Sequence, residues 1–173
     1  RNSVRSVAQR FGGIDILVNN AGNYETVEFD RLTLEQWDAI FASNVRGPFL
    51  VSRECLKFLR AREGKIINMG SLGGLRAWAT HAHYCSSKAA LHMLTKAMAK
   101  ALAPNVAVNC VAPGFMHTPL TEEYYWKDPH RSRWMFDRIP ARRAGLPEDL
   151  AGMGRFAILE DPTGAVFAAY NVL

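Results

Sequence analysis

The sequence contains no long apolar run. No stretch approaches the roughly 18 consecutive apolar residues that a membrane-spanning helix needs. The first residues, which begin with Arg1, also lack the apolar core of a signal peptide. These two absences predict a soluble cytoplasmic protein without a membrane partner.

Cysteine is scarce as well. The three cysteines lie far apart, form no CxxC pair and are odd in number. This pattern is typical of a reducing compartment and excludes a disulfide framework. His81 and His83 have no third ligand near them in the sequence, so no metal site is predicted. The cysteines are expected to fill the core: Cys55, Cys85 and Cys110.

Charge of one sign is not concentrated along the chain. The net charge of +5 arises from 21 basic and 16 acidic residues that are thinly spread, so no nucleic-acid partner is predicted. One arginine cluster is expected to form a solvated face, with an anion site or nucleic-acid binding as weaker alternatives. Its members are Arg131, Arg133, Arg138, Arg142 and Arg143.

Apolar residues are plentiful, since they make up 49% of the 173 positions, and this is enough for one core. Short strand-like runs alternate with longer helical patterns, which predicts an α/β domain with parallel strands joined by helices. The expected helices cover 4–11, 33–59, 83–102 and 147–159, and the expected strands cover 14–18, 65–69, 106–111 and 165–169. We predict one domain over 1–173, with an insertion at about 118–142.

The helix expected at 33–59 carries two local signals. Thr33 and Gln36 have the spacing of a capping box at its start. Pro48 lies four residues after Asn44, and proline offers no N–H to the carbonyl four residues earlier. The helix should therefore be distorted there, with the Asn44 carbonyl free.

Three residues have a spacing that suits acid/base chemistry. Tyr84 and Lys88 share one helix face, and Ser71 follows the strand at 65–69. A nearby ammonium favours the phenolate of Tyr84 and should lower its pKa, while a serine hydroxyl can donate to a carbonyl oxygen. Taken singly, Ser71 also fits a loop serine, Asn44 a surface residue, and Tyr84 with Lys88 an exposed pair.

Three glycines flank Ser71 in the loop that follows the strand at 65–69. Nothing like GxxxxGK follows, so these glycines are expected to make the loop flexible rather than to cradle a phosphate. They are Gly70, Gly73 and Gly74.

The order of these motifs resembles that of the short-chain dehydrogenase/reductase family over nearly the whole chain. The motifs are NNAG at 19–22, Asn44, Ser71, YxxxK at 84–88 and PGxxxT at 113–118. The resemblance implies a Rossmann-like, doubly wound parallel sheet. It also implies an oxidoreductase, active as a dimer or tetramer, that moves a hydride between NAD or NADP and a ketone or secondary alcohol.

The resemblance also implies residue roles. Tyr84 would be the general acid/base, Ser71 would orient the substrate carbonyl, and Lys88 would tune Tyr84 and hold the ribose hydroxyls. Asn44 would complete a proton relay through its carbonyl and a water. Phe115 through its N–H and Thr118 through its side chain would meet the nicotinamide carboxamide. The implied cofactor-binding positions are Asn19, Ala21, Gly22, Tyr84, Lys88, Pro113, Gly114, Phe115 and Thr118.

The sequence departs from the family at its start. Family members begin with a strand, a glycine-rich turn and a helix that receive the pyrophosphate, and no TGxxxGxG-like stretch is found here. The fold is therefore expected to be incomplete, the choice between NAD and NADP stays open, and the strand at 14–18 should be an exposed edge. A catalytically silent fragment that acts by self-association or within a larger complex is the alternative function.

Aromatic residues suggest the substrate class. The insertion, where the family has a mobile lid, contains five of them, and Trp78 and Phe115 lie near the catalytic motifs. Such side chains favour a ring-bearing or acyl-chain carbonyl compound over a small polyol. Alternatively, Trp134 and Phe136 pin the lid to the core. The five are Tyr124, Tyr125, Trp126, Trp134 and Phe136.

Overall fold

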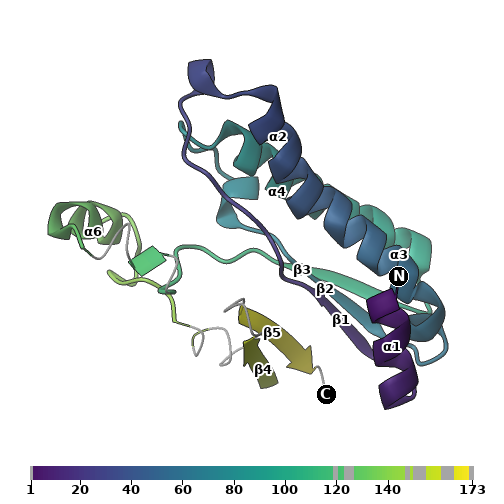
Figure 1. The fold of residues 1–173 in the computed structure, drawn as a ribbon. Helices are drawn as coiled ribbons and strands as arrows, with labels where there is room; N and C mark the ends of the chain where they lie inside the picture. Colours follow the sequence, from purple (N-terminus) through teal and green to yellow (C-terminus); the bar gives the residue numbers. More distant parts are fainter. Residues whose placement is uncertain are drawn as a thin grey trace.

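A computed structural model of the chain describes residues 2–118, 121–122, 127–146, 149, 155–160 and 166–171. Its centre is a sheet of parallel strands in the order β1 (Ile16–Asn19), β2 (Lys65–Met69) and β3 (Ala107–Val111) (Figure 1). Each strand is aligned with the next along its whole length. The α/β class and the three parallel strands predicted from the sequence are thus confirmed.

Helices connect these strands. The chain runs through α1 (Asn2–Phe11), α2 (Leu34–Phe41), α3 (Gly47–Arg60) and α4 (Ala82–Leu102), with short 3-10 turns η1 (Phe29–Arg31) and η3 (Leu72–Gly74). Of these helices, α3 packs against β1 and β2, and α4 packs against β3. No helix in the described ranges is long and apolar enough to cross a membrane.

The hydrophobic core lies between the sheet and these two helices. Leu59 of α3 and Ile66 of β2 are completely buried there. Since both faces of a parallel strand need cover, the apolar residues of β2 and β3 pack against the helix faces that point at the sheet. The buried members are Cys55, Leu59, Ile66, Leu102, Val106 and Val108.

The helix predicted at 33–59 is continuous but changes its winding. The Thr33 N–H donates to the Gln36 side chain (3.0 Å) and the Gln36 N–H donates to the Thr33 hydroxyl (3.2 Å), which confirms the capping box. Between α2 and α3 lies a π-helical turn, η2 (Ala42–Arg46), where the Gly47 N–H donates to the Ala42 carbonyl. A wider turn is the expected response to Pro48, which has no N–H for Asn44.

The first strand is less buried than the sequence indicates. A strand at 14–18 buried on both faces is predicted, but β1 begins at Ile16, whose side chain is 38% exposed. Within the described residues, β1 pairs with β2 alone and forms an edge of the sheet. An edge strand has cover on one flank only, so its apolar run does not ensure burial.

The C-terminal part contains a second, separate sheet. After α6 (Pro129–Phe136), β4 (Arg155–Glu160) pairs antiparallel with β5 (Val166–Asn171). The hairpin is not hydrogen-bonded to the parallel sheet, although β5 contacts β1 (Figure 1). The strand predicted at 165–169 is found as β5, but it pairs antiparallel and not within the parallel sheet. The helix predicted at 147–159 is wrong for 155–159, and 147–148 and 150–154 lie outside the described residues. A short apolar run does not distinguish helix from strand, and here a pairing partner follows directly.

A buried polar network joins the sheet to the two helices. The Asn19 amide donates to the Ser52 hydroxyl (3.0 Å) and to the Asn68 side-chain oxygen (2.8 Å). The Asn68 amide in turn donates to the Thr95 hydroxyl (2.9 Å), which donates to the Leu91 carbonyl (2.8 Å). The network thereby ties β1 and β2 to α3 and α4.

The network generates a stability prediction. Asn68→Ala should lower the free energy of unfolding by about 2–4 kcal/mol, because it removes two hydrogen bonds and leaves buried partners unpaired. Asn109→Ala is the matched control, since Asn109 lies on the adjacent strand and is exposed. Urea denaturation of both variants measures the difference. Equal losses in the two variants would show that the network contributes nothing.

Candidate active site

Ser71 lies where β2 gives way to a tightly held loop. Gly70 donates its N–H to the Val111 carbonyl (2.7 Å), and Leu72 donates to the Pro113 carbonyl (2.9 Å). The Ser71 hydroxyl accepts from the Gly73 N–H (3.0 Å), and Ser71 is 6% exposed. The loop thus extends the ladder between β2 and β3 and holds the serine at the carboxyl ends of these strands.

Tyr84 and Lys88 lie one turn apart near the start of α4. The Tyr84 ring lies beside the Ser71 hydroxyl, since a Cβ at Gly73 would lie 3.1 Å from the Tyr84 Cε1 and 3.4 Å from the Ser71 Oγ. The Lys88 ammonium lies 5.8 Å from the centre of the Tyr84 ring and donates to the Met69 carbonyl (2.8 Å). Lys88 is only 6% exposed, so the pair does not lie on the surface. The structure therefore brings together the three residues selected from their spacing.

The pKa of Tyr84 is shifted in the direction opposite to that expected. Burial raises the pKa of Tyr84, the hydrogen bond with Ser71 lowers it, and the neighbouring Cys85 and Tyr24 raise it further. The ammonium of Lys88 faces the Met69 carbonyl rather than the phenol oxygen, so burial dominates. Burial also lowers the pKa of Lys88, against a smaller opposing effect of Cys110.

Asn44 lies in the π-helical turn and is 1% exposed, so the reading as a surface residue is wrong. Its side-chain oxygen accepts from the Asn23 N–H (2.8 Å), and its amide donates to the Asn23 carbonyl (2.9 Å). The amide also donates to the Ser87 hydroxyl (3.0 Å), which bonds the Tyr84 carbonyl (2.8 Å). The side chain thus clamps the loop that follows β1 onto α4.

The NNAG motif divides into two parts. The Asn19 amide is turned into the buried network, so this residue holds β1 in place. Ala21 and Gly22 are exposed beyond the end of the strand. A Cβ at Gly22 would lie 3.2 Å from the Asn44 side-chain oxygen and 3.3 Å from the Lys88 ammonium. Gly22 therefore passes close to two of the candidate catalytic residues.

The PGxxxT motif leads away from β3 toward the C-terminal part. A Cβ at Gly114 would have no neighbour within 4 Å, so the backbone there is open. Phe115 accepts from the Gly145 N–H through its carbonyl (2.8 Å). The Thr118 N–H donates to the Thr121 hydroxyl (2.9 Å), and the two hydroxyls are 3.1 Å apart. These bonds hold the motif in a defined turn.

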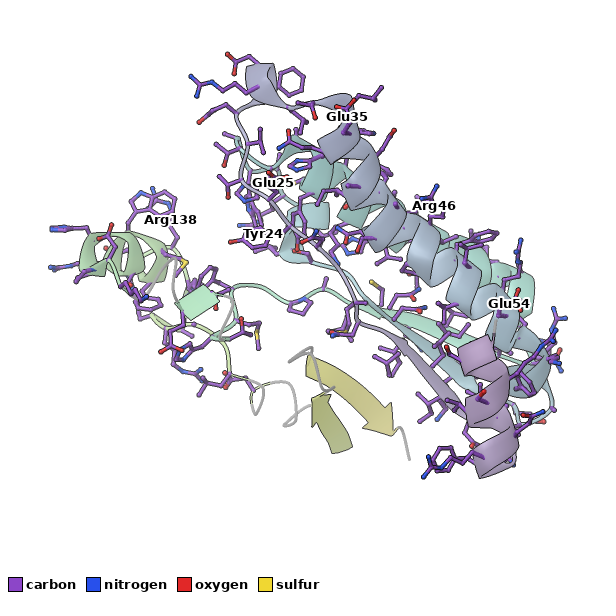
Figure 2. All side chains as sticks on the ribbon, viewed as in Figure 1. Tyr24, Glu25, Glu35, Arg46, Glu54 and Arg138 are labelled. Atoms are coloured by element: carbon purple, nitrogen blue, oxygen red, sulfur yellow. The ribbon has the colours of Figure 1, made fainter. Side chains whose placement is uncertain are left out.

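Aromatic rings surround Tyr84 and form an aromatic cluster of Tyr24, Trp78, His81 and Tyr84. Trp78 lies nearly parallel to Tyr84 with ring centres 6.0 Å apart, and Tyr24 meets Tyr84 edge-on at 6.1 Å. His81 stacks on Tyr24 at 5.8 Å. Figure 2 shows Tyr24 on the loop after β1, so this ring comes from a segment far from Tyr84 in the sequence.

Two hydroxyl groups hold the His81 ring of the aromatic cluster in place. Its ring nitrogens lie 3.1 Å from the Thr26 hydroxyl and 3.0 Å from the Thr80 hydroxyl. Trp78 is predicted from the sequence to lie near the substrate, whereas Tyr24 is not, and His81 is considered there only as a metal ligand. The position of Tyr24 two residues after NNAG is the signal that could have found it, because strand ends converge at the site.

The glycines of the loop are required by close packing, which corrects the expectation of flexibility. A Cβ at Gly74 would lie 2.8 Å from the Lys88 carbonyl carbon and 2.9 Å from the Ala89 nitrogen. A Cβ at Gly70 would meet the His92 ring (2.6 Å to Cδ2) and the Cys110 sulfur (2.7 Å). The loop can lie against α4 only because these side chains are absent.

The insertion is described in part. Trp134 is 61% exposed, and the Arg138 guanidinium lies 3.8 Å above its ring, so Trp134 does not pin the lid to the core. Tyr124, Tyr125 and Trp126 lie outside the described residues. Among the described residues, no three histidine, cysteine or acidic side chains are grouped to hold a metal ion.

Comparisons with known proteins identify relatives over most of the chain. The family model for short chain dehydrogenases matches residues 1–128. The 3-oxoacyl-acyl-carrier-protein reductase of Thermotoga maritima is 40% identical over 86% of this chain and 60% of its own length. The galactitol 2-dehydrogenase of Agrobacterium fabrum is 33% identical over 98% of this chain and 70% of its own length.

The fold has similar relatives among solved structures. A gluconate 5-dehydrogenase from Burkholderia cenocepacia, solved with NADP and tartrate, aligns with a TM-score of 0.82 and 35% identity. The alignment covers 88% of this chain and 60% of that one. The chain therefore spans about three fifths of the length of several relatives that it matches. Together with the match to the family model, these similarities establish that the chain belongs to the short-chain dehydrogenase family.

Proposed function

We propose that the protein is an oxidoreductase that moves a hydride between NAD or NADP and a ketone or secondary alcohol. Ser71, Tyr84 and Lys88 would carry the reaction, with Asn44 as a relay. The observation that carries this proposal is that the Tyr84 ring and the Ser71 hydroxyl border the same point at Gly73, with the buried Lys88 ammonium one helical turn from Tyr84. Two hydroxyl side chains that lie side by side can both reach a single substrate oxygen.

The site residues fit the nicotinamide and ribose part of such a cofactor. The Lys88 ammonium has three N–H donors and donates one of them to the Met69 carbonyl, so donors remain for ribose hydroxyls. Gly22 has no side chain between the end of β1 and this ammonium. Phe115 and Thr118 would meet the carboxamide from the turn after β3. When bound, the cofactor supplies or accepts the hydride.

The proton chemistry follows from the environment of Tyr84. In ketone reduction, Ser71 would donate a hydrogen bond to the carbonyl oxygen, and Tyr84 would give that oxygen its proton as the hydride reaches carbon. Because burial raises the pKa of Tyr84, the phenol stays protonated at neutral pH and is ready to donate. Lys88 would stabilise the phenolate that remains. Alcohol oxidation runs these steps in reverse and needs the phenolate first.

The substrate is proposed to carry a ring or an acyl chain. The support is the aromatic cluster, in which Tyr24 and Trp78 present flat apolar surfaces beside the phenol of Tyr84. The similarity to a 3-oxoacyl reductase agrees with this class. The relatives named for galactitol and gluconate favour the competing class of polyols and sugar acids.

A homo-oligomer is also proposed. Three consecutive residues of α3, Phe49, Leu50 and Val51, are 43%, 41% and 40% exposed. An exposed apolar run on a helix is typical of a surface that associates with a second copy.

Tyr84→Phe should lower kcat by about 10²–10⁴-fold without altering the fold, because only the proton-carrying oxygen is lost. Steady-state kinetics with a ketone substrate and circular dichroism test this. Ser86→Ala is the control, since it removes an exposed hydroxyl two residues along the same helix. Comparable turnover in Tyr84→Phe and the unmodified protein would refute the acid/base role.

Lys88→Ala should weaken NAD or NADP binding by about tenfold, a change of about 1.4 kcal/mol, in addition to lowering kcat. The reason is that the ammonium would bind ribose hydroxyls as well as stabilise the phenolate. Isothermal titration calorimetry measures the affinity, and Lys96→Ala, two turns along α4 and exposed, is the control. An unchanged affinity in Lys88→Ala, with only the pH profile altered, would remove the ribose role.

A panel of cyclic ketones, long-chain ketones and small polyols tests the substrate class. We expect the higher kcat/KM for the cyclic and long-chain compounds, and we expect Trp78→Ala to lower kcat/KM for these more than for polyols. The physical reason is the loss of an apolar surface that stacks near Tyr84. A preference of the unmodified protein for polyols contradicts the proposal.

A further inference from the structure

His92 is placed on the same face of α4 as the two candidate catalytic residues, one turn beyond Lys88 and two turns beyond Tyr84. Its Nε2 accepts the backbone N–H of Ser71 at 3.2 Å. The ring is half-buried and fills the space above two glycines: a Cβ at Gly70 would lie 2.6 Å from its Cδ2, and one at Gly74 2.7 Å from its Cε1. The ring thus has little freedom to move away.

The hydrogen bond with His92 is made by Ser71, one of the candidate catalytic residues. The Ser71 N–H leads into the loop turn in which the Ser71 hydroxyl accepts from the Gly73 N–H and lies beside the Tyr84 ring. The backbone nitrogen and the hydroxyl belong to one residue, so anchoring the nitrogen limits where the hydroxyl can lie. His92 is therefore joined to Tyr84 by two routes, along α4 and through Ser71.

The hydrogen bond requires a neutral imidazole. An Nε2 that accepts carries no proton, and a protonated ring would present an N–H to the N–H of Ser71. Burial lowers the pKa of His92, and the charged groups Lys88 and Lys96 on its own helix lower it further. From the loop it faces the Ser71 N–H, and on the β3 side the Cys110 thiol lies at Gly70.

We propose that His92 is a positioning residue that holds the Ser71 loop in its reactive place and releases it when the imidazole is protonated. This inference rests on the proposed function, since it concerns the hydroxyl that would orient the substrate carbonyl. The sign follows from the chemistry. The neutral form, and the stability it contributes, are present above the ordinary histidine pKa and are lost as pH falls through the lower value of the folded protein.

Kinetics of two variants in the full chain test the proposal. His92→Leu removes the acceptor and should lower kcat about tenfold while KM for the cofactor changes less than twofold. His92→Gln keeps an acceptor oxygen that does not titrate, so it should restore most of kcat and abolish the loss of activity on the acid side. Met93→Leu, on the 63% exposed neighbour, is the control and should behave like the unmodified protein.

Nuclear magnetic resonance provides a readout that needs no activity. Nitrogen-15 shifts of His92 should show a proton on Nδ1 and an accepting Nε2 at neutral pH. The Ser71 amide shift should follow the His92 titration in the unmodified protein and stay constant in His92→Gln. The positioning role is overturned by a protonated Nε2, by a Ser71 amide that ignores His92, or by a kcat in His92→Leu equal to that of Met93→Leu.

The two proposals fail in different ways. An unmodified protein that binds cofactor but turns over no ketone or alcohol overturns the proposed function and, with it, the catalytic part of this inference. If the protein turns over substrate and His92→Gln still loses activity at acid pH, only the role of His92 is overturned.

Discussion

The candidate site depends on the close approach of the loop after β2 to the backbone of α4. At Gly74 the two backbones are so near that a Cβ would lie 2.8 Å from the Lys88 carbonyl carbon. This contact places Ser71 beside Tyr84 and brings the Met69 carbonyl within 2.8 Å of the Lys88 ammonium. A side chain at Gly74 would push the loop away from the helix. Ser71 would then no longer lie beside Tyr84 and Lys88.

The sequence predicts well those features of the fold that depend on residues close together in the chain. The capping box at Thr33 and the distortion before Pro48 both depend on residues within four positions of one another, and both are found. The spacing of Tyr84 and Lys88 likewise predicts a shared helix face. The strand at 155–160 was not predictable in this way, because its partner is a second segment and its own composition suits a helix equally well.

Properties set by long-range contacts were predicted less well. The shift of the Tyr84 pKa depends on how deeply the phenol is buried and on where the Lys88 ammonium points. The four-residue spacing of Tyr84 and Lys88 in the sequence predicts neither. The side-chain amide of Asn19 donates to Ser52 and Asn68, a structural role that the motif alone does not indicate, and its assignment to the cofactor stays a prediction. The contact of His92 with Ser71 was not predicted, because its partner is a backbone N–H and every residue type except proline has one.

A single rigid helix face carries most of the proposed chemistry. Successive turns of α4 present Tyr84, Lys88 and His92, and the Thr95 hydroxyl on the next turn accepts from Asn68 in β2. Because the helix is tied to the sheet through this last bond, a rotation of α4 would move the phenol, the ammonium and the imidazole together. The geometry of the proton donor relative to the strand ends is therefore maintained by buried polar bonds two to three turns away from it. Such an arrangement keeps the reacting groups in place without adding polar groups to the apolar surface that Tyr24 and Trp78 offer to a substrate.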